Sequence, residues 1–347
     1  MTTSEATAGA APVRIVWLFP DRGTIRENRA DEANFWSGYR RVGGELGCVV
    51  ETCSPELVDM RYAPGGRLEV FLDGAPVTPA DAVFVTEFWT FPHMVRDVWS
   101  SLTVAHLLAE AGFYLPISPQ WSVRANDKLL TVARLAPLLR HASVLPTARI
   151  TTGRDLEERG YAGLLREIGF PAVVKPASWA AQQGIVVVRD EVELICALRL
   201  ASAADLPVVV QRRLDPQRLV SYRMFGMDGE VLATRRYAPV PGHVLIGARL
   251  GGTDRWVDAP PELVEDAERV MAAVPTSFLC LDFLAEDERY YLSEIELDAG
   301  IGVQMMADHP RAAEVLRRRL ASYLCGHRRW LDRPADPAPS APPSPGE

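Results

Sequence analysis

The chain has 347 residues, of which 48% are hydrophobic and 24% are charged, and its formal net charge is −8. This balance predicts a globular protein of two or three domains, and it argues against nucleic acid as the main partner because phosphate backbones require basic surfaces. No apolar run is long enough to span a bilayer, and the first residues lack the basic start and apolar stretch of a signal peptide. The five cysteines show no CxxC spacing and the six histidines are scattered, so we expect reduced thiols in a cytoplasmic protein without a histidine-based zinc site.

The first part of the chain, residues 13–126, alternates strand and helix patterns after an expected disordered start at 1–12. Such alternation predicts an α/β domain with a mainly parallel sheet. Asp73-Gly74 marks the turn of a small hairpin. The expected elements are strands at 13–19, 48–54 and 81–89, helices at 31–47 and 100–112, and the hairpin at 67–77.

Two further parts follow, at 127–206 and 207–332, before a proline-rich tail at 333–347 that we expect to be disordered. Their patterns mix helices with strands joined by short turns, which indicates an α+β arrangement. The second part has expected helices at 127–139 and 190–201 and strands at 148–151, 170–177 and 184–189. The third part has expected strands at 207–214, within 221–237, and at 278–285 and 289–297, and helices at 260–274 and 312–324.

Lysine is almost absent from the chain. Of 37 basic residues only Lys128 and Lys175 are lysines, and the other 35 are arginines. A compact ammonium reaches between phosphate oxygens where the planar guanidinium fork does not fit, so the two lysines mark candidate phosphate contacts. Retention by chance is the alternative. Lys175 ends an apolar strand, and Lys128 begins a helix, where anions are favoured.

Carboxylates gather on the last two predicted strands. Glu294 and Glu296 share one strand face because alternate side chains point the same way, and Asp282 sits on the preceding strand. If the strands pair as an antiparallel hairpin, three acids lie together, which is costly without a cation. Oxygen-rich clusters favour Mg²⁺, or Mn²⁺ as an alternative, and Mg²⁺ commonly arrives with nucleotide phosphates. The competing interpretation is a solvated outer face.

The order of these motifs resembles the ATP-grasp family, which includes D-alanine–D-alanine ligase, glutathione synthetase and ribosomal-protein glutamate ligases. The resemblance rests on SVRANDKLLT, FPAVVKP, PVVVQRRL, SYRMFGMDGEVLATRRYAP and LDFLAEDERYYLSEIEL, between residues 115 and 305. It implies an ATP-grasp fold preceded by an N-terminal α/β domain. It also implies ATP contacts at Lys128, Lys175, Gln183, Gly184, Gln211, Arg212, Arg213, Leu214 and Asp215, and Mg²⁺ ligands at Asp282, Glu294 and Glu296.

The sequence departs from the family pattern in three places. Glu296 stands where the family usually has Asn, the loop ASWAAQQG after Lys175 has only one glycine, and the acid that holds the ribose is represented only by Asp215. An altered metal preference and a different hold on phosphate are the expected consequences.

The resemblance implies a carboxylate–amine ligase that uses ATP and an acyl-phosphate intermediate, acting on amino acids or small peptides. Phosphoryl stabilisation is assigned to three arginines, and substrate contacts to two short segments. These are Arg223, Arg236 and Arg249 for the phosphoryl group, and Glu87, Trp89, His93, Gly300 and Gly302 for the substrates. The alternatives are a kinase that phosphorylates a small-molecule hydroxyl and a nucleotide-binding protein without catalysis. Small-molecule carboxylates and amines are the expected partners, and a homodimer stays open.

Overall fold

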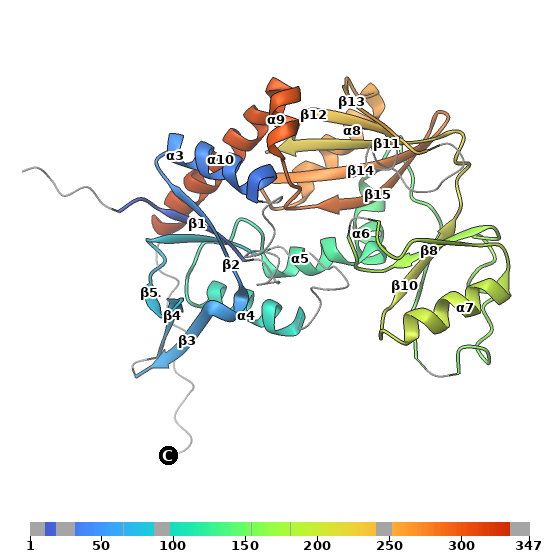
Figure 1. Cartoon of the computed structure of the whole chain (residues 1–347), viewed down its shortest axis with the longest axis horizontal. Coiled ribbons are helices and arrows are strands. Elements are labelled where there is room, and N and C mark those ends of the chain that lie inside the picture. Colours follow the sequence, from blue (N-terminus) through green and yellow to red (C-terminus); the bar gives the residue numbers. More distant parts are fainter. Residues whose placement is uncertain are drawn as a thin grey trace, which may run out of the picture.

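The computed structural model describes residues 11–18, 32–64, 66–86, 98–153, 155–180, 182–240 and 252–333. The chain runs through three sheet-containing regions, with the first and third packed together and the second extending to one side (Figure 1). None of the helices in the described ranges combines the length and the apolarity that crossing a bilayer requires.

The first region contains the predicted parallel sheet, in the order β2-β1-β6. The central strand β1 is buried along almost its whole length, as its apolar sequence predicts. The sheet and its helices comprise β1 (Arg14–Leu18), β2 (Val49–Cys53), β6 (Ala82–Val85), a π-helical turn η1 (Glu32–Trp36), α3 (Ser37–Glu45) and α4 (Val98–Glu110). A separate antiparallel sheet is formed by β3 (Val58–Ala63), β4 (Arg67–Leu72) and β5 (Ala75–Val77), next to the 3₁₀ turn η2 (Pro55–Leu57). Asp73 and Gly74 both have positive φ, which confirms the predicted hairpin turn.

Two short helices connect the first region to the second. Ser118 caps α5 (Pro119–Asn126), which the sequence analysis did not predict, and Asp127 caps α6 (Lys128–Leu135) by accepting hydrogen bonds from Leu129 N and Leu130 N. The 3₁₀ turn η3 (Ala136–Leu138) continues α6. Because α6 packs against the last strand of the third region, its first residue lies between regions two and three.

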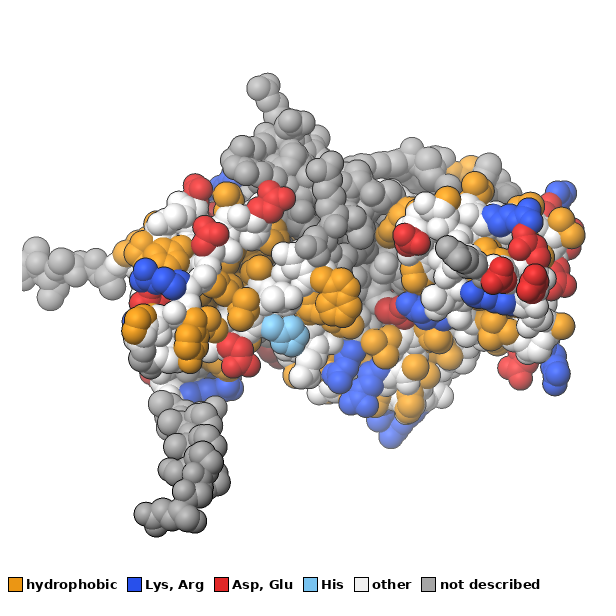
Figure 2. Space-filling model, turned by 90° about the horizontal axis from the view of Figure 1, so that it is seen from below, with side chains coloured by type: hydrophobic (Ala, Val, Ile, Leu, Met, Phe, Trp, Pro, Cys, Tyr) orange, Lys and Arg blue, Asp and Glu red, His pale blue; other side chains and the backbone are white. Residues whose placement is uncertain are grey.

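The second region is an antiparallel sheet in the order β7-β10-β8-β9. Its elements are β7 (Thr147–Ile150), β8 (Ala172–Pro176), β9 (Val186–Val188), β10 (Val208–Arg212) and α7 (Glu191–Ser202). The strand β10, which opens the third part in the sequence-based division, hydrogen-bonds here to β7 and β8. Acidic and basic side chains are interspersed over this region in Figure 2. Two of the ion pairs in this region join Arg189 to Glu193 and Arg199 to Glu157.

The third region is a five-stranded antiparallel sheet in the order β13-β12-β11-β14-β15. The predicted pairing of the two acidic strands is confirmed, with β14 and β15 joined by a tight turn. The elements are β11 (Leu219–Met227), β12 (Glu230–Ala238), β13 (Thr253–Val257), α8 (Pro261–Ala273), β14 (Phe278–Glu286), β15 (Arg289–Glu296), α9 (Val303–Asp308) and α10 (Pro310–Leu331). One large apolar core continues from this sheet to β1 and α3, so the first and third regions share a hydrophobic interior.

Candidate functional site

A cavity of about 600 Å³ opens between the second and third regions. Most residues assigned to nucleotide or metal from the sequence line it. These are Lys128, Lys175, Gln183, Gln211, Arg212, Arg213, Leu214, Asp282, Glu294 and Glu296. Arg223, assigned to the phosphoryl group, and Gly300, assigned to a substrate, also line the cavity. The residues come from segments far apart in the chain, so the fold brings together the groups that the motifs predicted.

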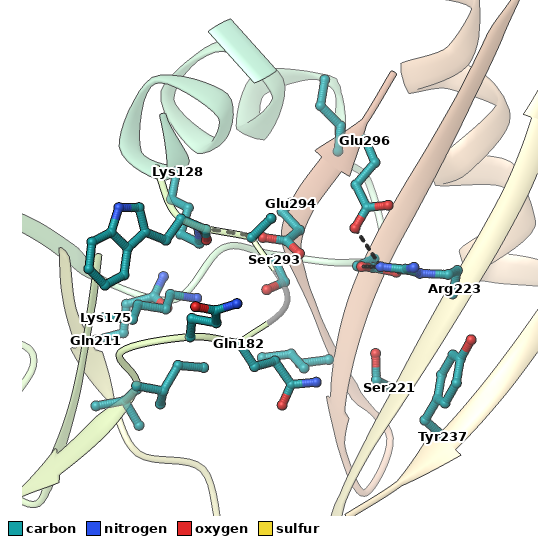
Figure 3. Close-up of a pocket in the computed structure, with 18 of the residues that line it drawn as sticks. Lys128, Lys175, Gln182, Gln211, Ser221, Arg223, Tyr237, Ser293, Glu294 and Glu296 are labelled. Atoms are coloured by element: carbon teal, nitrogen blue, oxygen red, sulfur yellow. Dashed lines mark hydrogen bonds and ion pairs between the residues drawn. The ribbon is translucent and has the colours of Figure 1, made fainter. Parts of the chain in front are cut away.

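Two lysines stand at one side of the cavity (Figure 3). Lys128 is positioned by the start of α6: its backbone N–H donates to Ala177 O at 3.0 Å, and its Nζ donates to Trp179 O at 2.8 Å. The same ammonium lies 3.8 Å from a carboxylate oxygen of Glu294. Lys175 is carried by β8 and is only 8% exposed. Burial, reinforced by the neighbouring charge of Lys128, lowers the pKa of Lys175 to about 8, although Glu294 acts in the opposite direction.

The three predicted metal-binding acids meet on one face of the β14–β15 pair. Asp282 is opposite Glu294 and Cys280 is opposite Glu296, with an irregularity in the pairing after Asp282. One oxygen from each of Asp282, Glu294 and Glu296 lies within 4.8 Å of the others. Ile295, between the two glutamates, is buried in the opposite layer, as strand alternation predicts. Such a set of carboxylate oxygens fits the coordination preference of Mg²⁺.

Arg223 on β11 links two of the acids. Its guanidinium donates to Asp282 at 2.9 and 2.6 Å and to Glu296 at 2.6 Å. Burial opposes the charged guanidinium, but Asp282 and Glu296 outweigh it and raise the pKa of Arg223. One arginine therefore pairs with two carboxylates, and Figure 3 shows its interaction with Glu296.

The three acids have different protonation behaviour because their neighbours differ. Burial raises the pKa of Glu296 to about 7, with Arg223 opposing and the other two acids reinforcing the shift. Burial also raises the pKa of Asp282 against the effect of Arg223. For Glu294, burial is outweighed by the two lysines and Arg223, which together lower its pKa. Glu294 is therefore the acid held most firmly in its charged form.

The predicted hinge segment, from the end of β10 to Leu214, forms another wall. Gln211 is buried and donates to Thr147 Oγ1 at 2.8 Å, while Arg212 approaches Glu286 at 3.4 Å. The Nε atom of Arg213 is buried and finds no hydrogen-bond partner among the described residues. Around this wall, Leu145, Val173, Leu214, Leu219 and Leu284 give the cavity an apolar lining. A flat heteroaromatic ring could lie between these side chains, with the adjacent main chain available for hydrogen bonds.

Several predicted site residues do not line the cavity. Arg236 is not among the lining residues: alternate residues of β12 face opposite sides, and Arg235 and Tyr237 are the ones that line the cavity. Asp215 accepts from Gln217 N at 2.9 Å and shapes a turn outside the cavity. Gly184 and Gly302 also lie off the lining. Four predicted residues fall outside the described residues: Glu87, Trp89, His93 and Arg249.

Other residues that were not predicted from the sequence also line the cavity. Arg235 is held by Asp254 in a two-point ion pair and stacks against Trp256 at 5.1 Å. Tyr237 has a raised pKa because it is buried. The one available signal was strand alternation, which places residues 235 and 237 on the face of Arg223 once the register is known. Ser221, Ser293, Trp179, Gln182 and Phe35 also line the cavity. All except Phe35 lie within segments singled out in the sequence, but none of the five was assigned to the site.

No protein-family model matches the chain. It is 28% identical to a D-alanine–D-alanine ligase of Synechococcus sp. (strain JA-3-3Ab) over 129 residues, which cover 37% of this chain and 38% of that protein. It is 25% identical to a formate-dependent phosphoribosylglycinamide formyltransferase of Burkholderia pseudomallei (strain 668) over 211 residues, 59% of this chain and 50% of that protein. The chain therefore matches only half, or less, of the length of these relatives.

Solved structures match over nearly the whole chain. The D-alanine–D-alanine ligase from Bacillus anthracis complexed with ATP superposes with a TM-score of 0.60 at 14% identity, over 92% of this chain and 99% of that one. The D-cycloserine synthetase DcsG gives a TM-score of 0.59 at 17% identity, over 89% and 99%. The ATP-grasp ligase PsnB, complexed with a minimal precursor, gives 0.59 at 16% identity, over 91% and 100%. The chain has the ATP-grasp fold.

Proposed function

We propose that the protein is an ATP-dependent carboxylate–amine ligase that forms an amide bond through an acyl phosphate. The observation that carries the proposal is the convergence of two ammonium groups and three carboxylates on one cavity. Ammonium groups suit phosphate oxygens, and the carboxylate oxygens suit the Mg²⁺ that accompanies them. The similarity to amide-forming ligases of the same fold supports the reaction class by analogy.

In this proposal the nucleotide would lie with its base against the hinge wall and its phosphates toward the lysines. Lys128 and Lys175 would hold the phosphates, and Asp282, Glu294 and Glu296 would hold the metal. Mg²⁺ bound there would neutralise charge on the transferred phosphoryl group. Mn²⁺ is the alternative ion.

The chain's own residues would then position the reactants. A substrate carboxylate attacks the γ-phosphorus, and ADP leaves. The amine attacks the resulting acyl carbon, inorganic phosphate leaves, and the amine nitrogen loses a proton to complete the amide. Arg223 and Arg235 project from neighbouring strands into the cavity, where their guanidinium groups are placed to stabilise negative charge on the phosphoryl group and on the tetrahedral oxyanion. No covalent nucleophile from the chain is required.

A screen of amino-acid and dipeptide pairs for ATP-dependent phosphate release tests the proposal. A ligase releases phosphate only when both an acid and an amine are present, and an amide product accumulates. A stable phosphorylated product would instead identify a kinase, and nucleotide binding without ADP formation would identify a non-catalytic protein. The homodimer and the cytoplasmic location stay predictions from the sequence.

A further inference from the structure

The cavity changes character along its length. Strand β15 orders its lining, because a strand advances about 3.3 Å per residue. Tyr291 lies at the hinge end, where it packs with Leu214. The charged centre follows at Glu294 and Glu296, and the segment after β15 then contributes Gly300 and Met305. The charged centre therefore separates the end of the cavity beyond the metal-binding acids from the apolar hinge wall.

Phe35 closes this far end. It belongs to the π-helical turn η1 of the first region, and it approaches Gly300 so closely that a Cβ atom on that glycine would lie 2.9 Å from Phe35 Cε1. Its neighbour Trp36 packs against Trp17 and Tyr39, with ring centroids 5.7 and 5.4 Å away. Trp36 therefore anchors the turn in the core, while the ring of Phe35 is half-buried and lines the cavity. Single π-turns of this kind are frequent at functional sites.

Met305 supplies the other side of this end. It projects from α9, which contacts η1, and it is half-buried against the main core. Its flexible thioether can adapt to ligands of different shape. The three described lining residues at this end, Phe35, Gly300 and Met305, carry no charge. A charged substrate side chain would lose hydration here without compensation, whereas an apolar side chain would gain from burial.

We propose that Phe35 and Met305 form an apolar subsite that selects a substrate amino-acid residue with a side chain of the leucine, methionine or phenylalanine type. The subsite rests on the proposed ligase function, since it lies directly beyond the centre where the acyl group would react. Gly300 is part of the subsite, because any larger residue at this position would displace the Phe35 ring. Hydrophobic contacts of this size discriminate side chains by about 10- to 100-fold.

The test combines turnover with direct binding. Phosphate release is measured with substrate pairs that differ in one side chain, leucine or phenylalanine against aspartate or lysine, for the wild-type protein, Phe35→Ala and Met305→Ala. We expect kcat/KM to favour the apolar side chains by at least about tenfold in the wild type, and each variant to lose most of that preference through KM. The Kd of MgATP should not change. The conservative variant Met305→Leu should keep the preference that Met305→Ala loses. The control variant Tyr62→Ala changes an aromatic residue that is 72% exposed, and it should leave the preference intact.

Calorimetry separates failure of the subsite from failure of the ligase proposal. Phenylalanine is titrated into the wild type and Phe35→Ala, each saturated with Mg²⁺ and a non-hydrolysable ATP analogue. Binding that is lost in Phe35→Ala supports the subsite even if no substrate pair releases phosphate. A wild-type preference for charged side chains, an equal loss for all substrates in Phe35→Ala, or no phenylalanine binding would overturn it.

Discussion

Two arginine–carboxylate clusters, one fully buried and one partly exposed, use the same chemical groups in opposite ways. In the first, Arg319 of α10 is fully buried, and each of its three guanidinium nitrogens donates to a group of the protein. It donates to Tyr323 Oη at 2.9 Å, to Ala299 O at 3.1 Å, to Tyr39 Oη at 3.3 Å, and to Asp298. Trp17 Nε1 donates to the same Asp298 at 3.0 Å. This cluster ties β1 and α3 to the end of β15 and to α10, and it is closed to any ligand.

The second cluster, around Arg223, is left open. One guanidinium divides its bonds between Asp282 and Glu296, and the side chains of Glu296 and Glu294 are each 29% exposed to the cavity. Its carboxylates retain free lone pairs that no described residue uses. Only Leu297 separates Glu296 from Asp298, yet one acid faces the cavity and the other is buried in the core. The structural ion pair and the candidate binding site therefore differ both in burial and in how completely neighbouring groups satisfy their polar atoms.

The largest expected effect comes from the open cluster. Lys175→Met and Glu294→Gln should each lower kcat/KM for phosphate release by about 1000-fold or more, because each removes a group that stabilises the transferring phosphoryl charge. The free energy of unfolding, measured with urea, should change by less than about 1 kcal/mol in each variant, since neither side chain fills the core. Retained turnover in either variant would remove the phosphate and metal assignments. An equally large loss of stability would show that these residues are structural instead.

The closed cluster should show the reverse pattern. Arg319→Ala leaves the buried Asp298 without its cation and should lower the free energy of unfolding by about 3–5 kcal/mol. The matched control is Arg317→Ala on the same helix, where the side chain is 46% exposed and pairs with Glu45 at the surface. That control should change stability by less than about 0.5 kcal/mol. Equal losses in the two variants, measured by urea unfolding, would contradict the contrast between the clusters.

The affinity for ATP should depend on pH through Lys175, which lies in the cavity beside the open cluster, and not through the closed cluster. Lys175 has a pKa of about 8 rather than the ordinary 10.5, because burial and Lys128 disfavour its charge. Bound phosphates favour the charged ammonium, so above pH 8 binding must take up a proton, and affinity falls as pH rises through this value. Calorimetry with MgATP should show at least about a tenfold weaker Kd at pH 9.5 than at pH 7. Lys175→Met should bind weakly at both values, and a wild-type affinity independent of pH would rule out this role for Lys175.

The sequence predicted the open cluster better than the closed one. Lys128, Lys175 and the three acids lie in motifs whose order and strand alternation specify their faces, and the structure brings them together. Arg319 lies in a run of three arginines, 317–319, and only the packing of α10 decides which of them is buried. The same limit applies to β12, because its register with β11 decides that Arg235, and not Arg236, lies opposite Arg223. Phe35 belongs to another region of the chain, and only tertiary packing brings it to the cavity.

The smallest expected effect comes from replacing Glu296, the acid of the open cluster that lies nearest in the sequence to Asp298 of the closed cluster. Glu296→Asn introduces the residue that the ATP-grasp pattern usually has, and it keeps an oxygen that can bind Mg²⁺. It removes the 2.6 Å ion pair with Arg223, whose two bonds to Asp282 remain. Because burial already makes the charge of Glu296 costly, we expect kcat to stay within about tenfold of the wild type and the Mg²⁺ requirement to rise only modestly. Asp282→Asn should be more harmful, since Asp282 accepts two of the three hydrogen bonds of Arg223. Titration of turnover with Mg²⁺ decides the matter: a loss in Glu296→Asn as complete as in Glu294→Gln would show that the third carboxylate has become indispensable in this chain.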